Sequence, residues 1–275
     1  MLRRSISILK SRGVSVLLRA AAARLRGMLA NQAKSFDTYQ ERFADKAGIE
    51  IGGPSSVFKR DGIFPIYPIA GSLDNCDFSH TTVWAGDAIC DQTYCFDRDR
   101  PAGRQHIAEA TALGAIPSQS YDFLLSSHVL EHCANPILAL TEWKRLLKKG
   151  GMLVLLLPNK QHTFDHRRPV TTLQHMITDF ETGMTEDDVT HVAEVLALHD
   201  FVRDPDAGDM ESFKLRCIRN IENRCLHHHV FDAPVAIELI RYAGLTIHSI
   251  EEIEPHHILL VTSSATAQQY PENHG

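Results

Sequence analysis

The sequence predicts an α/β protein with a Rossmann-like, doubly wound sheet, and residues 121–159 are the main reason. This segment begins with a short apolar run, continues with a helical pattern of apolar residues and ends with an uninterrupted apolar run at residues 152–157. A strand, a helix and a second strand, with both strands apolar on both faces, form a crossover unit of a buried parallel sheet. A chain of 275 residues can bury a large core, so we expect one main domain with additions.

The helix within this segment is predicted by one apolar face and by its end signals. The face consists of Ile137, Leu138, Leu140, Trp143, Leu146 and Leu147. Lys148 and Lys149 suit the negative end of a helix, and the pair Gly150-Gly151 can supply a left-handed cap. We therefore expect the helix to stop at these glycines, and Pro158 to end the strand that follows.

Other elements follow in chain order. We expect a strand that ends near Glu50, a second strand within residues 66–79 and a third within residues 106–122. Residues 226–246 fit a last helix with Gly244 as its cap, and residues 247–254 and 257–262 fit a closing hairpin with Pro255 at the turn. Helical periodicity at residues 171–180 and 188–199 predicts a small helical cap inserted at 159–235.

Residues 121–159 also carry short motifs in a definite order. In that order they are Asp122-Phe123, Ser126, Glu131-His132, Leu147-Lys148 with Gly150-Gly151, and Pro158. The ordered set resembles the second half of a class I S-adenosylmethionine-dependent methyltransferase, of the methyltransferase type 11-like kind. The resemblance spans roughly residues 45–265. It implies a sheet of seven strands with a C-terminal antiparallel hairpin strand, and S-adenosylmethionine as the cofactor.

The resemblance also implies where the cofactor's methionine part would lie. In the family the first strand ends in an acid followed by a glycine loop, which here corresponds to Glu50, Gly52 and Gly53. The acid fixes the loop, and the glycines let the backbone approach the ligand. Only the first of the family's three spaced glycines is kept, because Pro54 and Ser56 occupy the other two positions.

The ribose and adenine would meet the ends of the next strands. An acid after the second strand would accept both ribose hydroxyls, and Asp74 and Asp77 compete for that role. We favour Asp77, because it lies 24 residues after the second loop glycine, near the roughly 20-residue spacing of nucleotide-binding folds. Glu109 and Ala110 stand where the family has its adenine-reading pair, and Ser126 ends the central strand beside the cofactor.

Composition excludes some partners. Residues 1–35 hold eight Lys/Arg and no acid, so the other 240 residues carry 20 basic and 34 acidic side chains. An acidic body argues against nucleic acid as a partner, because phosphate neutralisation needs a basic face. Six scattered cysteines without a C-x-x-C pair indicate reduced thiols, and no apolar run approaches the roughly 20 residues of a membrane span. We expect a cytoplasmic protein.

The basic segment at residues 1–35 stands apart from a methyltransferase domain at 36–265 and a tail at 266–275. Apolar residues recur in it at helical spacing, namely Leu17, Leu18, Ala21, Leu25, Met28 and Leu29. Such a basic amphipathic helix can contact the inner membrane peripherally through residues 1–30. It also resembles an organelle transit peptide, and it could instead pack on its own acidic domain.

Eight of the sixteen histidines lie in the cap insertion, interleaved with aspartates. Three roles are open for them: a general base, a metal ligand, or a buried histidine satisfied by carboxylates and backbone. We expect structural roles for most and a base for one or two. No metal ligand is assigned, because no spacing of a known metal site occurs.

The expected reaction is O-methylation of a small polar or saccharide acceptor. A cap rich in His, Arg and Asp suits sugar hydroxyls better than a flat aromatic, for which only Trp84 and Trp143 offer stacking. A hydroxyl must lose its proton, and we name His132 and His166 as candidate catalytic bases, since both follow strands at the carboxyl edge of the sheet. The alternatives are an N- or C-methyltransferase, or a catalytically silent binding or scaffold module with the same fold.

Overall fold

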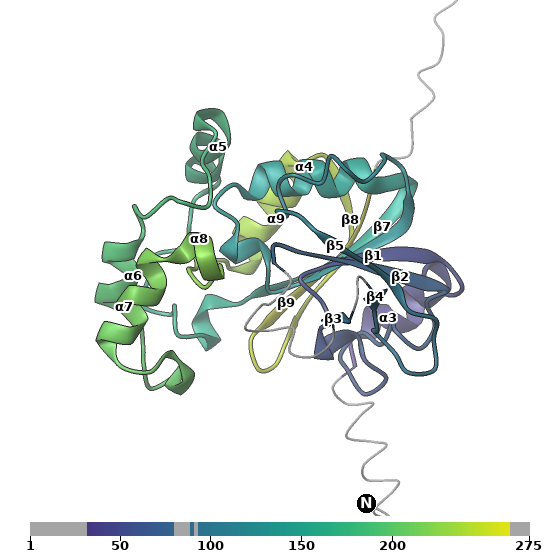
Figure 1. Cartoon of the computed structure of the whole chain (residues 1–275), viewed down its shortest axis with the longest axis horizontal. Coiled ribbons are helices and arrows are strands. Elements are labelled where there is room, and N and C mark those ends of the chain that lie inside the picture. Colours follow the sequence, from purple (N-terminus) through teal and green to yellow (C-terminus); the bar gives the residue numbers. More distant parts are fainter. Residues whose placement is uncertain (1–31, 80–88, 91–92, 265–275) are drawn as a thin grey trace, which may run out of the picture.

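The computed structural model describes residues 32–79, 89–90 and 93–264. The basic helix predicted within residues 1–30 and the tail at 266–275 therefore lie outside the described residues. Figure 1 shows a twisted sheet with helices packed on it and a separate group of helices beyond one end. Within the described ranges, no helix is both long and apolar enough to cross a membrane.

The sheet has the order β3-β4-β5-β2-β1-β6-β7-β9-β8. The strands are β1 (Ala47–Ile51), β2 (Ser72–Asp77), β3 (Ile89–Cys90), β4 (Thr93–Tyr94), β5 (Gly103–Ile107), β6 (Tyr121–Ser127), β7 (Leu147–Pro158), β8 (Leu245–Ile253) and β9 (His257–Ser264). Strands β5, β2, β1, β6 and β7 run parallel, whereas β9 is antiparallel to both β7 and β8. The predicted Rossmann-like sheet with a C-terminal antiparallel hairpin is confirmed, but it has nine strands where seven were predicted. The two-residue strands β3 and β4 extend its edge and are too short for a sequence pattern to reveal.

The central strands are apolar because both of their faces are covered. Phe123, Leu124 and Leu125 in β6 have no exposed surface, and five consecutive residues of β7, 153–157, are equally inaccessible. A parallel strand that is buried on both sides needs such a run instead of an alternating pattern. This is the physical basis of the strand–helix–strand prediction.

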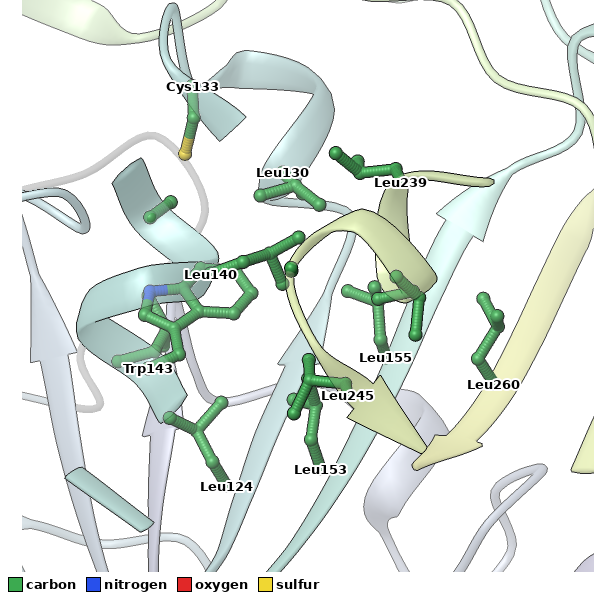
Figure 2. Packing of buried hydrophobic residues seen from close by; sticks show 14 of the residues in the cluster. Leu124, Leu130, Cys133, Leu140, Trp143, Leu153, Leu155, Leu239, Leu245 and Leu260 are labelled. Atoms are coloured by element: carbon green, nitrogen blue, oxygen red, sulfur yellow. The ribbon is translucent and has the colours of Figure 1, made fainter. Parts of the chain in front are cut away.

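One face of the sheet is covered by α4 (Pro136–Leu146) and α9 (Ala233–Tyr242), with α5 (Leu173–Thr182) contributing beside them. Figure 2 shows Leu140 and Trp143 packed over Leu124, Leu153 and Leu155 of the sheet. The indole of Trp143 is fully buried and donates a hydrogen bond to the carbonyl of Ala110 at 3.0 Å. Each fully buried side chain of this size stabilises the fold by roughly 1.5–3 kcal/mol relative to exposure.

The opposite face is covered by α3 (Lys34–Tyr39), by Phe43 and by residues 52–70 after β1, which are irregular apart from the 3₁₀ turn η2 (Ser56–Phe58). Other 3₁₀ turns of the described chain are η1 (Gln40–Arg42), η4 (Leu130–His132), η5 (Lys160–His162) and η6 (Pro205–Ala207). Phe43 packs edge-to-face on Phe64 and Phe123, with ring centroids 5.8 and 5.4 Å apart. In the described ranges, aromatic packing under loops thus replaces a full second row of helices on this face.

Two predicted helix boundaries were wrong. Helix α4 ends at Leu146, because strand β7 begins at Leu147, and residues 148–151 of that strand form a bulge between the Tyr121–Leu147 and Phe123–Met152 pairs. Helix α9 begins at Ala233 and not at residue 226. Its true start is signalled by Asp232, whose side chain accepts a hydrogen bond from Val235 N, and by a proline in the first turn.

The insertion at 159–235 is helical, with α5, α6 (Val192–Leu198), α7 (Met210–Ile218) and α8 (Asn220–Asn223). Helices α5 and α6 fall where the periodicity predicted them, whereas α7 and α8 were not predicted. A small apolar cluster holds α6 and α7 together and consists of Val192, Val195, Ala207, Phe213, Cys217 and Leu226. In Figure 1, α6, α7 and α8 lie beyond the end of the sheet, and α5 lies apart from them. We call residues 159–235 the cap.

Candidate active site

A cavity of about 600 Å³ lies at the carboxyl ends of the parallel strands. Its wall includes Gly52 after β1, Asp77 at the end of β2, Ser127 at the end of β6 and Pro158 at the end of β7. The cap supplies further wall residues, among them Phe213 of α7. Open α/β sheets bind ligands at this edge, and the volume lies within the range of small-molecule and cofactor sites.

Glu50 fixes the loop that follows β1 from behind the cavity wall. Its fully buried carboxylate accepts hydrogen bonds from the hydroxyls of Tyr67 and Tyr94, each at 2.5 Å, and from the Ser55 hydroxyl at 2.6 Å. Burial raises the pKa of Glu50 to about 7, even though these hydrogen bonds lower it. Glu50 is not itself among the lining residues. Its contacts fit the predicted task of holding the loop, and direct cofactor contact remains a prediction.

The two loop glycines have different surroundings. Gly52 lines the cavity with φ +79°, and a Cβ placed there would lie 2.5 Å from Cγ2 of Val129. Gly53 lies behind the wall, where its N–H donates to the side-chain oxygen of Asn75 at 2.9 Å and an added Cβ would collide with Glu50. Only Gly52 therefore offers bare backbone to a ligand, whereas Gly53 makes room for the support beneath it.

The structure brings Asp77, and not Asp74, to the cavity. The side-chain amides of Asn75 and Gln105 both donate to Oδ2 of Asp77, at 2.8 and 3.3 Å. Burial raises the pKa of Asp77 to about 6. Asp74 is absent from the lining and accepts a hydrogen bond from the Tyr121 hydroxyl at 2.7 Å. The position of Asp77 suits the ribose role predicted for it.

Glu109 and Ala110 both line the cavity, but the Glu109 carboxylate already has a partner. Arg224 of the cap forms an ion pair with it, and the Arg224 guanidinium lies 4.9 Å from the ring centroid of Phe78. Phe78 and Arg224 line the same part of the cavity and were not predicted. The cap thus reaches across to the loops where the resemblance puts the adenine.

Besides Glu50 and Gly53, two further residues named from the sequence do not reach the cavity. Ser126 is fully buried and its hydroxyl has no hydrogen-bond partner in the described part of the chain, whereas its neighbour Ser127 lines the wall. His166 is also absent from the lining, and its Nε2 lies 2.8 Å from Oδ2 of Asp200. Ser126 and Ser127 are neighbours on a strand, so their side chains point to opposite faces, and only Ser127 lines the cavity. His166 lies in a turn after η5, where its ring contacts Asp200 and not the cavity.

His132 does line the cavity, and its ring packs edge-to-face on His227 with centroids 4.5 Å apart. Nδ1 of His132 lies 3.2 Å from the carbonyl oxygen of Leu226, and Nδ1 of His227 lies 2.5 Å from Oδ2 of Asp165. Both partners are acceptors, so each ring carries its hydrogen on Nδ1 and keeps Nε2 as the basic nitrogen. Asp165 is oriented in turn by Nη1 of Arg168 at 3.1 Å.

The surroundings of His132 and His227 give the two imidazoles different base strengths. Burial lowers the pKa of His132 to about 3, which keeps its ring neutral and makes it a weak base. Burial alone would lower the pKa of His227 as well, but the Asp165 carboxylate outweighs it and raises that pKa. His227 also lines the cavity. His227 is therefore the stronger base of the two histidines. The carboxylate that raises its pKa belongs to Asp165, which lies 62 residues earlier in the chain.

Comparison with known proteins agrees with this geometry. Residues 76–155 match the sequence profile of a methyltransferase domain family. No curated protein matches the chain at a significant level.

Among solved structures, the chain is similar to S-adenosylmethionine-dependent methyltransferases of Mesorhizobium loti (14% identity, TM-score 0.47) and Aquifex aeolicus (10%, 0.46). The match covers 83% of this chain and 95% of the Mesorhizobium one, and 86% and 97% for Aquifex. It is also similar to 1,6-didemethyltoxoflavin-N1-methyltransferase of Burkholderia thailandensis, which has S-adenosylhomocysteine bound. That pair has 12% identity, a TM-score of 0.46, and coverage of 90% and 89%.

The sheet order and the cavity at its carboxyl edge are those of an open α/β fold with a ligand site at the ends of its strands. The family profile runs from the end of β2 to Leu155 of β7, so it includes Asp77 and Ser127 of the cavity wall but not Gly52. Residues 76–155 thus carry a methyltransferase domain, for which S-adenosylmethionine is the cofactor, and the sheet and its cavity agree with that activity.

Proposed function

We propose that this enzyme transfers the methyl group of S-adenosylmethionine to a hydroxyl oxygen of a small polar or saccharide acceptor, with His227 as the general base. The supporting observation is the Asp165–His227 pair on the wall of the same cavity that Gly52 and Asp77 line. The cap, residues 159–235, is then the acceptor-binding half of the site. Five described cysteines are free thiols, which suits a reducing cytoplasm.

The residues fit the cofactor on the sheet side. Gly52 offers backbone at a place where a side chain would collide with Val129, and Asp77 presents a carboxylate held by two amides. Glu109 and Phe78 line the part of the wall beyond Asp77. When bound, S-adenosylmethionine supplies an electrophilic methyl group on a sulfonium. These side chains would bind and orient it, which is most of what a methyltransferase must do.

The reaction also needs a base for the proton of the acceptor hydroxyl. The acceptor oxygen forms a bond to the methyl carbon while the carbon–sulfur bond breaks, and the hydroxyl proton must leave. Nε2 of His227 receives that proton, and the Asp165 carboxylate stabilises the resulting imidazolium. Arg168, which is 1% exposed, holds Asp165 in place.

The acceptor side of the cavity is polar. Asp204, Asp206 and Arg216 of the cap line it together with the aromatic rings of Phe164 and Phe213. Charged side chains of both signs suit an acceptor with several hydroxyls, because a hydroxyl can both donate and accept hydrogen bonds.

An isotope-labelling experiment tests the proposal. The enzyme is incubated with S-adenosylmethionine carrying a trideuterated methyl group and with the small-molecule and oligosaccharide fraction of the cells that make it. Products that gain the label are isolated, and the transferred methyl is identified by mass and by the chemical shift of its carbon. We expect an O-methyl product. An N-methyl or C-methyl product would replace the proposed acceptor atom, and binding of the cofactor without any labelled product would favour the silent module.

A further inference from the structure

Four potential metal ligands meet on the side of the cap where α5 packs against the segment before α9. His175 and Asp179 lie one turn apart on α5, His191 directly precedes α6, and His229 lies in the segment before α9. We call these four residues the α5 cluster. None of them lines the cavity of the candidate active site. Methyl transfer in that cavity therefore does not explain why these four side chains lie together.

The ligand atoms of the α5 cluster are spaced as they would be around one metal ion. Nε2 of His175 lies 3.2 Å from Nε2 of His191 and 3.4 Å from Oδ2 of Asp179. A tetrahedral zinc ion with bonds of about 2.0–2.1 Å separates neighbouring ligand atoms by roughly 3.3–3.4 Å. Nε2 of His229 lies 3.9 Å from the same Asp179 oxygen and 3.4 Å from the carbonyl oxygen of Ala134, a long contact that it would exchange for a bond to the metal.

The three imidazole rings surround a common point. Ring centroids are 5.1 Å apart for His175 and His191, 6.0 Å for His175 and His229, and 6.1 Å for His191 and His229. A stacked pair or a row of rings would make one of these separations much longer than the others. The three near-equal separations describe a triangle of rings, and Asp179 lies with His175 and His229 in one group of potential metal ligands.

Hydrogen bonding within the described part of the chain leaves two polar atoms of this cluster unsatisfied. Oδ2 of Asp179 and Nδ1 of His229 are buried and have no hydrogen-bond partner there. A buried carboxylate oxygen without a donor costs free energy of about 1–3 kcal/mol or more, and a cation would remove that cost for Asp179. Two nitrogens of the same type that face each other at 3.2 Å are also the arrangement that a shared metal ion produces.

The wider surroundings favour a cation. Asp188 and His228 form a second ligand group that shares His191, with Oδ2 of Asp188 at 3.6 Å from Nδ1 of His228. Glu186 lies behind His228, at 3.8 Å from its Nε2. Asp179, Asp188 and Glu186 thus place three carboxylates in or next to the α5 cluster, and their negative charge favours a divalent cation there. The His175 side chain is 43% exposed, which provides an entry path from solvent.

We propose that His175, Asp179, His191 and His229 bind one divalent transition-metal ion of the zinc class. Three imidazoles and a carboxylate form a ligand set that suits zinc and leaves no open position for chemistry, so the ion is structural. It links α5 and the start of α6 to the segment that carries His227, two residues before His229. No spacing in the sequence signals this site, because its ligands come from three separate segments.

Metal binding to the full-length, tag-free protein tests this proposal without any methyl acceptor. After treatment with a chelator, the protein is titrated with Zn²⁺ against a chromophoric competitor and with Co²⁺ by visible absorption. We expect one tightly held Zn²⁺ and a Co²⁺ spectrum typical of four-coordination. His175→Ala should weaken Zn²⁺ binding by at least about 100-fold, because losing a ligand costs no less than losing its supporting partner. Zn²⁺ should raise the Tm of the wild type and not that of this variant.

Matched variants separate this site from non-specific binding to a histidine-rich chain. His162→Ala removes an exposed histidine outside the α5 cluster and should leave Zn²⁺ affinity unchanged. His175 is exposed, so its variant should stay folded, and unchanged binding of S-adenosylmethionine verifies this. Equal Zn²⁺ affinity of the wild type and His175→Ala would overturn the proposal. Loss of binding in Asp188→Asn but not in His175→Ala would also overturn it, by placing the ion in the neighbouring group.

Discussion

The sheet and the cap are built by different forces. The sheet is held by continuous apolar packing on both faces, as at Leu124 and Leu155, which have no exposed surface. The cap has one small apolar cluster, and its buried interior also contains charged and polar side chains such as Arg168, Asp165 and His228. Hydrophobic burial is non-directional, whereas polar groups in an interior must each find a partner. The sheet is therefore the stable support, and the cap is the part whose geometry its polar contacts specify.

The largest expected effect is on the sheet side. Trp143→Ala removes a fully buried indole and its hydrogen bond to Ala110, and should lower the free energy of unfolding by about 3–5 kcal/mol. Chemical denaturation followed by circular dichroism measures this change. Leu215→Ala is the control. Leu215 lies on α7 and is 55% exposed, so this substitution should change stability by less than about 0.5 kcal/mol. A small effect of the Trp143 change would show that the sheet core is not the main source of stability.

A comparable change in the cap should act locally. Arg168→Ala leaves the buried Asp165 carboxylate without its cation and removes hydrogen bonds to Glu194 and to the His227 carbonyl. Breaking a buried ion pair costs about 3–5 kcal/mol. We expect this loss to open the cap while the sheet stays folded, which hydrogen exchange resolves by segment.

Arg167→Ala is the matched control for that experiment. Arg167 is 51% exposed and pairs with Asp200 at 3.2 Å, and surface pairs contribute only about 0–1 kcal/mol. Hydrogen exchange in the cap should therefore stay near that of the wild type. If Arg168→Ala instead unfolded the sheet and the cap together, the two regions would form one cooperative unit and the comparison would fail.

These differences explain what the sequence could and could not predict. Apolar runs revealed β6 and β7 because burial on both faces leaves a pattern in neighbouring residues. The spacing after the glycine loop selected Asp77, which the structure brings to the cavity. The Asp165–His227 pair joins residues 62 positions apart through a polar contact, and no periodicity records such a contact. His166 was named instead because it is close in the chain to the end of β7.

Substitutions at Asp77 and Asp74 test the cofactor-binding side of the sheet. Asp77→Ala should weaken S-adenosylmethionine binding by about 2–3 kcal/mol, because it removes charged hydrogen bonds to the ligand. Asp74→Ala should be nearly neutral for binding, since Asp74 lies outside the cavity wall. Isothermal titration measures both. The opposite ranking would mean that the ribose lies elsewhere.

The smallest expected effect is on the pH dependence of that binding. The pKa of Asp77 is raised to about 6 by burial, and a ribose hydroxyl donates to the ionised form. Affinity should therefore be fully developed above pH 6 and fall as the pH drops through that value, by about tenfold at pH 5. Titrations from pH 5 to pH 8 check this, with Asp77→Asn as the control that should show a flat profile over the lower part of the range. A steep loss in the Asn variant would assign the titration to another group.

The central claim is that the cap contributes the base to a cofactor site built by the sheet. Its most direct test is the single-turnover rate of methyl transfer to the acceptor that the labelling experiment identifies, measured for the wild type, His227→Ala and His132→Ala. We predict that His227→Ala lowers this rate by about 10²–10⁴ while S-adenosylmethionine affinity is kept, and that His132→Ala has the smaller effect. A near wild-type rate in His227→Ala, with its fold and cofactor binding intact, would contradict the claim.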